Sequence, residues 1–277
     1  MKPSVAAASV AIGLLVASGA AAQGKSHQSH GNNSRPSESA LPTATAAGTA
    51  ATGALPFAAL DDAALVDAGT VWVGFSLARW SGSDTTELQA PVVDAAVGVT
   101  PRMQLALTVP RIVNDSGSAV GTTFASAKFS LLEGAVKLAV APTLEVLDAS
   151  AVDASTGRAR VGLPVSVEVD RGPTRGYASA GFFTGGVRYI GAGTAVDLRP
   201  RLTISGALSH AWQAADARSG LPDAVRTECT GAAAYAVTNG FVVFAAASHT
   251  IATADENGAG ATLSAGASFL VARRRVR

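Results

Sequence analysis

Short runs that alternate between large apolar residues and small or polar residues follow one another through most of this chain. In the clearest run the two parities are Met103, Leu105, Leu107 and Val109 against Gln104, Ala106 and Thr108. A period of two places successive side chains on opposite faces of a β-strand. Helical periodicity is almost absent, so the sequence predicts an all-β protein.

The N-terminus has the features of a secretion signal. Lys2 supplies a positive charge, residues 5–16 form an apolar stretch, and Ala20, Ala21 and Ala22 offer the small residues of a cleavage site. The apolar stretch has about 12 residues, which is too short to anchor the chain across a bilayer. We therefore expect residues 1–22 to be a signal peptide that is cleaved after Ala22.

The composition is more apolar than that of a typical soluble exported protein, with 48% hydrophobic and 15% charged residues. No segment after the signal reaches the ~18 consecutive apolar residues of a membrane helix. A closed barrel explains a high apolar content without a membrane helix, because half of the residues of each strand face lipid and no long apolar run is needed. We predict an antiparallel transmembrane β-barrel in the outer membrane of a Gram-negative-type bacterium.

The connections between the predicted strands alternate in length. The tight ones are residues 100–102, 133–134, 198–201 and 238–240, and the longer, more polar ones are residues 114–120, 148–157, 214–224 and 253–260. Short turns at one end and longer loops at the other are typical of outer-membrane barrels. Residues 177–198 are too long for one strand, and a break near Thr184, Gly185 and Gly186 gives about 12 strands.

Four regions follow from these patterns: a signal peptide (1–22), a flexible N-terminal lead (23–66), a β-barrel (67–272) and a basic C-terminal tail (273–277). The lead has too few large apolar residues to offset the entropy of ordering. Whether it enters the barrel or stays in the periplasm is left open by the sequence.

Charged residues recur on the parity opposite most of the large apolar side chains. These candidate lumen-lining residues are Asp94, Lys128, Lys137, Glu145, Arg160, Glu168 and Arg188. An Arg or Lys on the lipid face costs about 2–4 kcal/mol at the bilayer midplane, so we expect them inside. Two interpretations stay open: they line a path for small solutes, or they form ion pairs that plug the barrel.

Aromatic residues are sparse, at 5% of the chain, but several lie near predicted strand ends. The candidates for anchors at the membrane interface are Trp80, Trp212, Tyr177, Tyr189 and Tyr235. Trp72 lies on the interior parity. Phe182 and Phe183 are interpreted as girdle residues or as the lining of an apolar entry.

Pro142 and Pro164 fall inside two of the predicted strands. Each removes a backbone donor from the ladder, so we expect each to lie at a bulge or at the end of a strand.

Sequence motifs for catalysis, metals and nucleic acids are lacking. Cys229 is the single cysteine, and the net charge is +1. Ser209 and Ser248 each precede a histidine, but adjacent strand residues point to opposite faces and cannot act together. We predict that the protein is not an enzyme and has no cofactor, no metal site and no nucleic-acid partner.

Three short phrases resemble one family of bacterial outer-membrane proteins, the putative transporters related to the phenol-degradation meta-pathway and aromatic-hydrocarbon uptake proteins. The phrases are VGVTPRMQLALTVP at 97–110, RGYASAGFF at 175–183 and DLRPRL at 197–202. The resemblance covers residues 69–271. It implies an outer-membrane barrel that moves small apolar compounds and has no catalytic residues.

The C-terminus departs from the usual outer-membrane pattern. Such barrels end on an aromatic residue that the barrel assembly machinery reads, whereas here Phe269 is followed by the basic tail. The expected partners are outer-membrane lipid, this machinery and a small-molecule solute.

The sequence therefore predicts a passive channel or transporter for small solutes, hydrophobic ones included. Two alternatives stay open: a structural or adhesive barrel with a plugged lumen, and a soluble periplasmic β-sandwich that binds a ligand.

Overall fold

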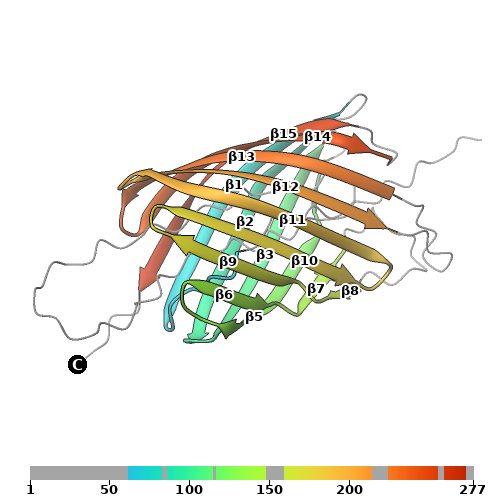
Figure 1. The fold of residues 1–277 in the computed structure, drawn as a ribbon. Helices are drawn as coiled ribbons and strands as arrows, with labels where there is room; N and C mark the ends of the chain where they lie inside the picture. The colour runs from blue at the N-terminus through green and yellow to red at the C-terminus, as the bar shows by residue number, and fades with distance from the viewer. Residues whose placement is uncertain are drawn as a thin grey trace, which may run out of the picture.

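The chain forms an antiparallel β-barrel whose strands run obliquely around a common axis (Figure 1). The computed structural model describes residues 62–82, 86–114, 117–147, 159–213, 224–254 and 259–272. The strands are β1 (Thr70–Gly82), β2 (Thr86–Thr100), β3 (Met103–Asn114), β4 (Gly117–Val120), β5 (Thr123–Leu132), β6 (Val136–Val140), β7 (Thr143–Val146), β8 (Ala159–Gly162), β9 (Val165–Arg171), β10 (Thr174–Phe183), β11 (Val187–Arg199), β12 (Leu202–Gln213), β13 (Ala224–Thr238), β14 (Phe241–Thr253) and β15 (Gly260–Ala272).

The first and last strands close the barrel. β1 pairs with β15 over its whole length, from Thr70 opposite Ala272 to Gly82 opposite Gly260. β4 and β5 both pair with β3, β6 and β7 both pair with β5, and β8 and β9 both pair with β10. Each of these pairs is therefore one wall strand in two pieces, and the wall has 12 strands in all. The predicted barrel is confirmed, and the alternative of a β-sandwich is wrong.

The two prolines divide wall strands without shifting their register. Pro142 separates β6 from β7, and Pro164 separates β8 from β9. The pairing with β5 keeps the same register on both sides of Pro142, as Phe129 opposite Val140 and Ser126 opposite Thr143 show. The Pro142 carbonyl accepts a hydrogen bond from the Ala127 N–H (3.0 Å), and the Pro164 carbonyl accepts one from the Ala141 N–H (2.9 Å). The prolines thus lie at strand ends, as expected, and their carbonyls still join the ladder.

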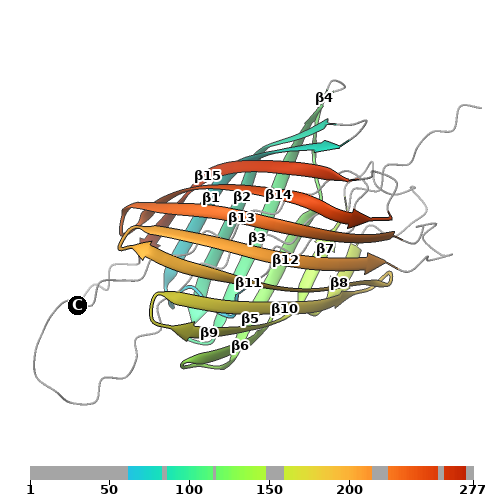
Figure 2. The ribbon, with the colours of Figure 1, turned by 45° about the horizontal axis from the view of Figure 1, so that its top comes forward.

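Tight turns gather at one end of the barrel, here called the turn end (Figure 2). They join β2 to β3, β5 to β6, β9 to β10, β11 to β12 and β13 to β14. The other end, the loop end, carries the remaining connections. There the turn of residues 184–186 is short, and it divides residues 177–198 into β10 and β11 as predicted.

One predicted loop is shorter than expected. Residues 114–120 were expected to be a polar loop, but Gly117 to Val120 form β4, which pairs with the end of β3. The added pairing lengthens the β3–β4 hairpin at the loop end. The predicted loops at 148–157 and 214–223, and residues 255–258, lie outside the described residues.

Polarity is inverted relative to a soluble protein. Large apolar side chains face outward, as Phe75 (47% exposed), Leu77 (55%) and Leu107 (46%) illustrate. Polar side chains on the opposite parity are buried, as Asp94 (4% exposed) and Gln104 (1%) illustrate. An apolar outer band around a polar interior is the arrangement of an outer-membrane barrel.

The predicted signal peptide (1–22), most of the lead (23–61) and the tail (273–277) lie outside the described residues. In the part of the chain that is described, no helix is long and apolar enough to cross a membrane.

Closure predicts heat-modifiability on a gel. The unboiled protein is expected to run faster than the boiled protein, because a closed barrel resists detergent until it is heated. Ala267→Pro is expected to abolish the fast band, because Ala267 lies opposite Phe75 of β1 and Val243 of β14, and proline cannot donate to the ladder. Ala267→Val keeps the backbone donor and is expected to retain the fast band. Equal bands for the two variants would contradict the closure seen here.

Candidate functional site: the barrel interior

Five of the seven predicted lumen-lining residues have side chains buried inside the barrel. They are Asp94, Lys128, Glu145, Arg160 and Glu168. Lys137 also reaches inward, where it contacts Glu168 and Asp170, and its side chain is 19% exposed. The Asp94 carboxylate accepts a hydrogen bond from the Thr108 hydroxyl of the neighbouring strand at 2.7 Å.

Arg188 is a correction, because its side chain is exposed on the outer face. It follows the turn of residues 184–186, and its guanidinium lies 6.0 Å from the ring centre of Phe182. The apolar neighbours Val187 and Tyr189 are the residues that face inward here. At the rim of a barrel, an outward charge costs only about 0–1 kcal/mol.

The end of the N-terminal lead lies inside the barrel. Residues 62–66, here called the pre-strand segment, are each at most 8% exposed. Ala63 and Leu65 pack against Ala139, and Val66 packs against Trp72 and Ala96. The sequence left the course of the lead open, and these residues place its last part in the interior.

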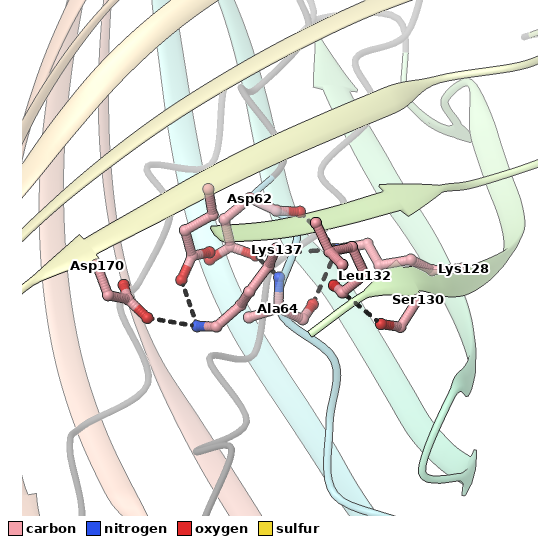
Figure 3. A network of polar contacts seen from close by, with 8 residues as sticks. Asp62, Ala64, Lys128, Ser130, Leu132, Lys137 and Asp170 are labelled. Carbon is pink, nitrogen blue, oxygen red and sulfur yellow. Dashed lines mark hydrogen bonds and ion pairs between the residues drawn. The ribbon is translucent and has the colours of Figure 1, made fainter. Parts of the chain in front are cut away.

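Lys128 and Gln104 hold the pre-strand segment by hydrogen bonds (Figure 3). The Lys128 ammonium donates to the carbonyls of Asp62 (3.0 Å) and Ala64 (3.2 Å), and it lies 3.9 Å from the Asp62 carboxylate. The Val66 N–H donates to the Gln104 side-chain oxygen at 2.6 Å. Because Lys128 binds backbone carbonyls, it fixes the path of the chain rather than one side chain.

Gly98 marks where the chain leaves the interior. A Cβ atom there would lie 2.2 Å from the Asp67 carbonyl oxygen and 2.3 Å from that of Val66. The Gly69 N–H donates to the Gly98 carbonyl at 2.7 Å. Only glycine permits so close an approach of two backbones.

A second charged group lies beside the segment. The Lys137 ammonium contacts the Glu168 carboxylate at 2.6 Å and the Asp170 carboxylate at 2.8 Å. Lys137 and Glu168 are direct partners across β6 and β9. In Figure 3 the Lys137 side chain reaches toward Asp170, while Lys128 approaches the segment through Ala64 and Asp62.

A third charged group, the Glu145–Arg160 pair, lies nearer the loop end. Glu145 is 0% exposed and Arg160 5% exposed, and the nearest nitrogen and oxygen are 3.8 Å apart. An interior apolar cluster accompanies it, consisting of Phe124, Phe183, Val187, Tyr189, Ala211 and Ala224. The loop-end half of the interior is therefore partly apolar.

A fourth charged group was not found from the sequence. Arg226 lies 3.3 Å from Glu228, donates to the Thr250 hydroxyl at 3.0 Å and lies 6.0 Å from the ring centre of Trp80. The alternation pattern could have revealed this group, because Arg226 and Glu228 lie on the inward parity of β13. Asp62 carried no such signal, since its partner Lys128 is 66 residues away.

The predicted aromatic anchors divide between the two faces. Trp80 (2% exposed) and Tyr189 (3%) are buried inside, so their prediction as anchors is wrong. Tyr177 shares the inward parity of Phe183 on β10. Trp212 lies beside the outward His210, and Tyr235 is exposed.

Phe182 and Phe183, predicted as a pair, face opposite ways. Phe182 is exposed on the outside, and Phe183 is 1% exposed in the interior apolar cluster.

The two serine–histidine pairs also divide between faces, as predicted. Ser209 is buried, while the neighbouring His210 ring contacts the Thr227 hydroxyl at 2.9 Å. Within the described residues, no group of three His, Cys, Asp or Glu side chains could hold a metal ion.

Three solved outer-membrane channels and porins have a similar fold. The NanC porin matches with a TM-score of 0.55 at 10% identity, over 71% of this chain and 98% of its own. The COG4313 outer-membrane channel from Pseudomonas putida F1 matches with a TM-score of 0.52 at 18% identity, over 76% and 98%. The KdgM porin, solved in complex with disordered oligogalacturonate, matches with a TM-score of 0.52 at 8% identity, over 72% and 98%.

No protein-family model and no curated protein sequence matches this chain. The comparisons therefore establish the fold, a closed antiparallel β-barrel like that of outer-membrane barrels.

The Glu145–Arg160 pair gives a prediction for stability. Arg160→Met is expected to lower the free energy of unfolding by about 3 kcal/mol, because it leaves a buried carboxylate without its counter-charge. The double variant Glu145→Leu/Arg160→Met is expected to recover most of this loss, since it buries no charge. Urea unfolding in lipid vesicles measures both. A double variant as unstable as the single one would contradict the pairing, and the outward Arg188→Met serves as the control.

Lys128 gives a prediction for the pre-strand segment. In a Cys229→Ala background, a cysteine introduced by Ala63→Cys is expected to resist maleimide, because position 63 is 2% exposed. Adding Lys128→Met is expected to make it reactive, since two hydrogen bonds to the segment are lost. Lys137→Met is the matched control, because Lys137 bonds Glu168 and Asp170 instead. Equal labelling in all three proteins would show that Lys128 does not hold the segment.

Proposed function

We propose that the protein is an outer-membrane channel for the passive passage of small solutes, hydrophobic ones included. The observation that carries the proposal is a closed barrel whose interior combines charges of both signs with an apolar cluster. Because cations and acids are paired along the wall, strong selectivity for anions or for cations is not expected.

The fold supports the proposed orientation and location. Short turns of outer-membrane barrels face the periplasm, and the longer loops face outward. The pre-strand segment then lies toward the periplasmic half, since it precedes β1 at the turn end. Signal-peptide cleavage and insertion by the barrel assembly machinery remain predictions.

The solute class is supported by the division of the interior. In the loop-end half, Phe124, Phe183 and Tyr189 belong to the interior apolar cluster, and each is at most 3% exposed. An apolar solute that enters from this end would pass this apolar cluster before it reaches the charged groups around Lys128. Barrels of 8 strands are filled by side chains and those of 16 enclose wide channels, so 12 strands favour small solutes.

A second candidate function is a structural barrel with a plugged lumen. Residues 62–66 inside the barrel favour it, together with the buried ion pairs. The two functions differ in whether solutes or ions pass.

Conductance across a planar bilayer tests the proposal. The reconstituted full chain is expected to give stepwise currents, and Lys128→Met is expected to give larger steps, because the pre-strand segment is no longer held across the interior. Arg188→Met, on the outer face, is expected to conduct like the wild type. Silent bilayers for the wild type and for Lys128→Met, with both proteins heat-modifiable, would favour the plugged barrel.

A further inference from the structure

The outward charges at the loop end of the described strands are all cations. Three exposed arginines lie within three residues of the loop end of their strands: Arg79, Arg111 and Arg188. The acids of the described strands at this end are buried on the inward parity: Glu87, Glu145 and Glu228. The ion pairs of the described residues include none of these three arginines. At the turn end, by contrast, the exposed Arg102 has an acid partner, Glu133, at 3.7 Å.

Arg188 lies between two outward aromatic side chains. Its direct cross-strand partners are Phe182 of β10 and Trp212 of β12, and such partners share a face of the sheet. The Arg188 guanidinium is 6.0 Å from the ring centre of Phe182. Aromatic rings near the ends of membrane strands lie at the level of the lipid headgroups. The guanidinium is therefore placed where headgroups meet the barrel.

His210 adds a second polar group to this face. It pairs with Ile190, while Arg188 pairs with Trp212, so His210 and Arg188 are diagonal neighbours. Diagonal neighbours are about 7–8 Å apart, which is within reach of long side chains. The His210 ring stacks beside the Trp212 ring at 5.4 Å, and its Nδ1 contacts the Thr227 hydroxyl at 2.9 Å. One anionic group can therefore contact both Arg188 and His210.

An apolar surface continues from this point toward the middle of the barrel wall. Ile190 follows Arg188 on the outward parity of β11 and is 54% exposed, and Leu208 precedes His210 on β12 and is 52% exposed. The outer face of β10–β12 thus has rings and a cation at the rim and aliphatic side chains below them. This arrangement matches an amphiphile with an anionic head and acyl chains.

We propose that Phe182, Arg188, His210 and Trp212, here called the lipid patch, bind the phosphate group of an anionic membrane lipid in the leaflet at the loop end. The inference rests on the proposed location in the outer membrane but not on the passage of solutes. The planar guanidinium matches a phosphate group with two parallel hydrogen bonds. The acyl chains of the lipid lie along Ile190 and Leu208.

Quenching of tryptophan fluorescence by brominated lipids tests the lipid patch. Trp72 and Trp80 are buried inside the barrel at 6% and 2% exposed, so the quenched signal comes from Trp212. Phosphatidate and diacylglycerol with the same brominated acyl chains differ only in the phosphate group. In phosphatidylcholine vesicles that contain the full chain, half-maximal quenching is expected at about fivefold less phosphatidate than diacylglycerol, the size expected for one Arg at an anionic membrane surface.

Variants assign the preference to Arg188. Arg188→Met is expected to remove most of it, and Arg188→Lys is expected to keep part of it, because an ammonium group keeps the charge but not the planar fork. Arg102→Met is the matched control at the turn end and is expected to quench like the wild type. Heat-modifiability on a gel verifies that each variant is folded. A wild type without preference for phosphatidate would overturn the lipid patch, as would a folded Arg188→Met that keeps the preference.

Inorganic phosphate distinguishes a lipid site from a site for the free anion. An excess of inorganic phosphate is expected to leave the preference for phosphatidate unchanged, because the free anion has no acyl chains to pack on Ile190 and Leu208. Loss of the preference in its presence would overturn the assignment to a lipid.

The lipid patch and the channel fail separately. A preference for phosphatidate that Arg188→Met removes, in a protein that gives no current, supports the lipid patch and overturns the channel. Stepwise currents from a protein without this preference overturn the lipid patch and leave the channel.

Discussion

The pairing of β1 with β15 is the contact on which the rest of the structure depends. In lipid there is no water to satisfy an open sheet edge, so a membrane sheet has to close on itself. Here the closing pair runs the full length of both strands. The same demand explains how Pro142 and Pro164 are tolerated: their carbonyls accept neighbouring N–H groups, and the register stays unchanged on either side.

Closure of the barrel also determines on which face of the wall the charged side chains lie. The outer surface has to be apolar, so charged residues gather inside. Among the described residues, four interior cations lie beside an acid: Lys128 by Asp62, Lys137 by Glu168, Arg160 by Glu145 and Arg226 by Glu228. Buried ion pairs contribute little net stability unless hydrogen bonds complete them. Three of these groups have such bonds. Within the described part of the chain, the Glu145 carboxylate oxygens and the Arg160 terminal nitrogens have no hydrogen-bond partner. The interior is thus uneven in how well its charges are satisfied.

The sequence predicts the strands and the inward parity well, because a period of two is a local signal. The prediction of inward and outward side chains fails at the ends of strands. Beside the turn of residues 184–186, the apolar Val187 and Tyr189 face inward and Arg188 outward, the reverse of the pattern along most of the wall. Trp80 was misplaced for the same reason, since a strand end suggests an interfacial anchor while its ring lies by Arg226 inside. The place of Asp62 depends on a contact 66 residues distant, which no local pattern encodes.

The two halves of the interior differ because the turn-end half contains the pre-strand segment. Its small residues Ala63 and Ala64 let the backbone approach the wall, and Lys128 binds that backbone directly. A segment held by a few hydrogen bonds and small apolar contacts is weakly stabilised compared with the wall, where every strand is hydrogen-bonded to two neighbours. The loop-end half instead contains the interior apolar cluster and the Glu145–Arg160 pair, whose carboxylate oxygens and terminal nitrogens have no hydrogen-bond partner in the described residues. In the channel we propose, control of passage therefore falls to the pre-strand segment, which a few hydrogen bonds hold in the interior.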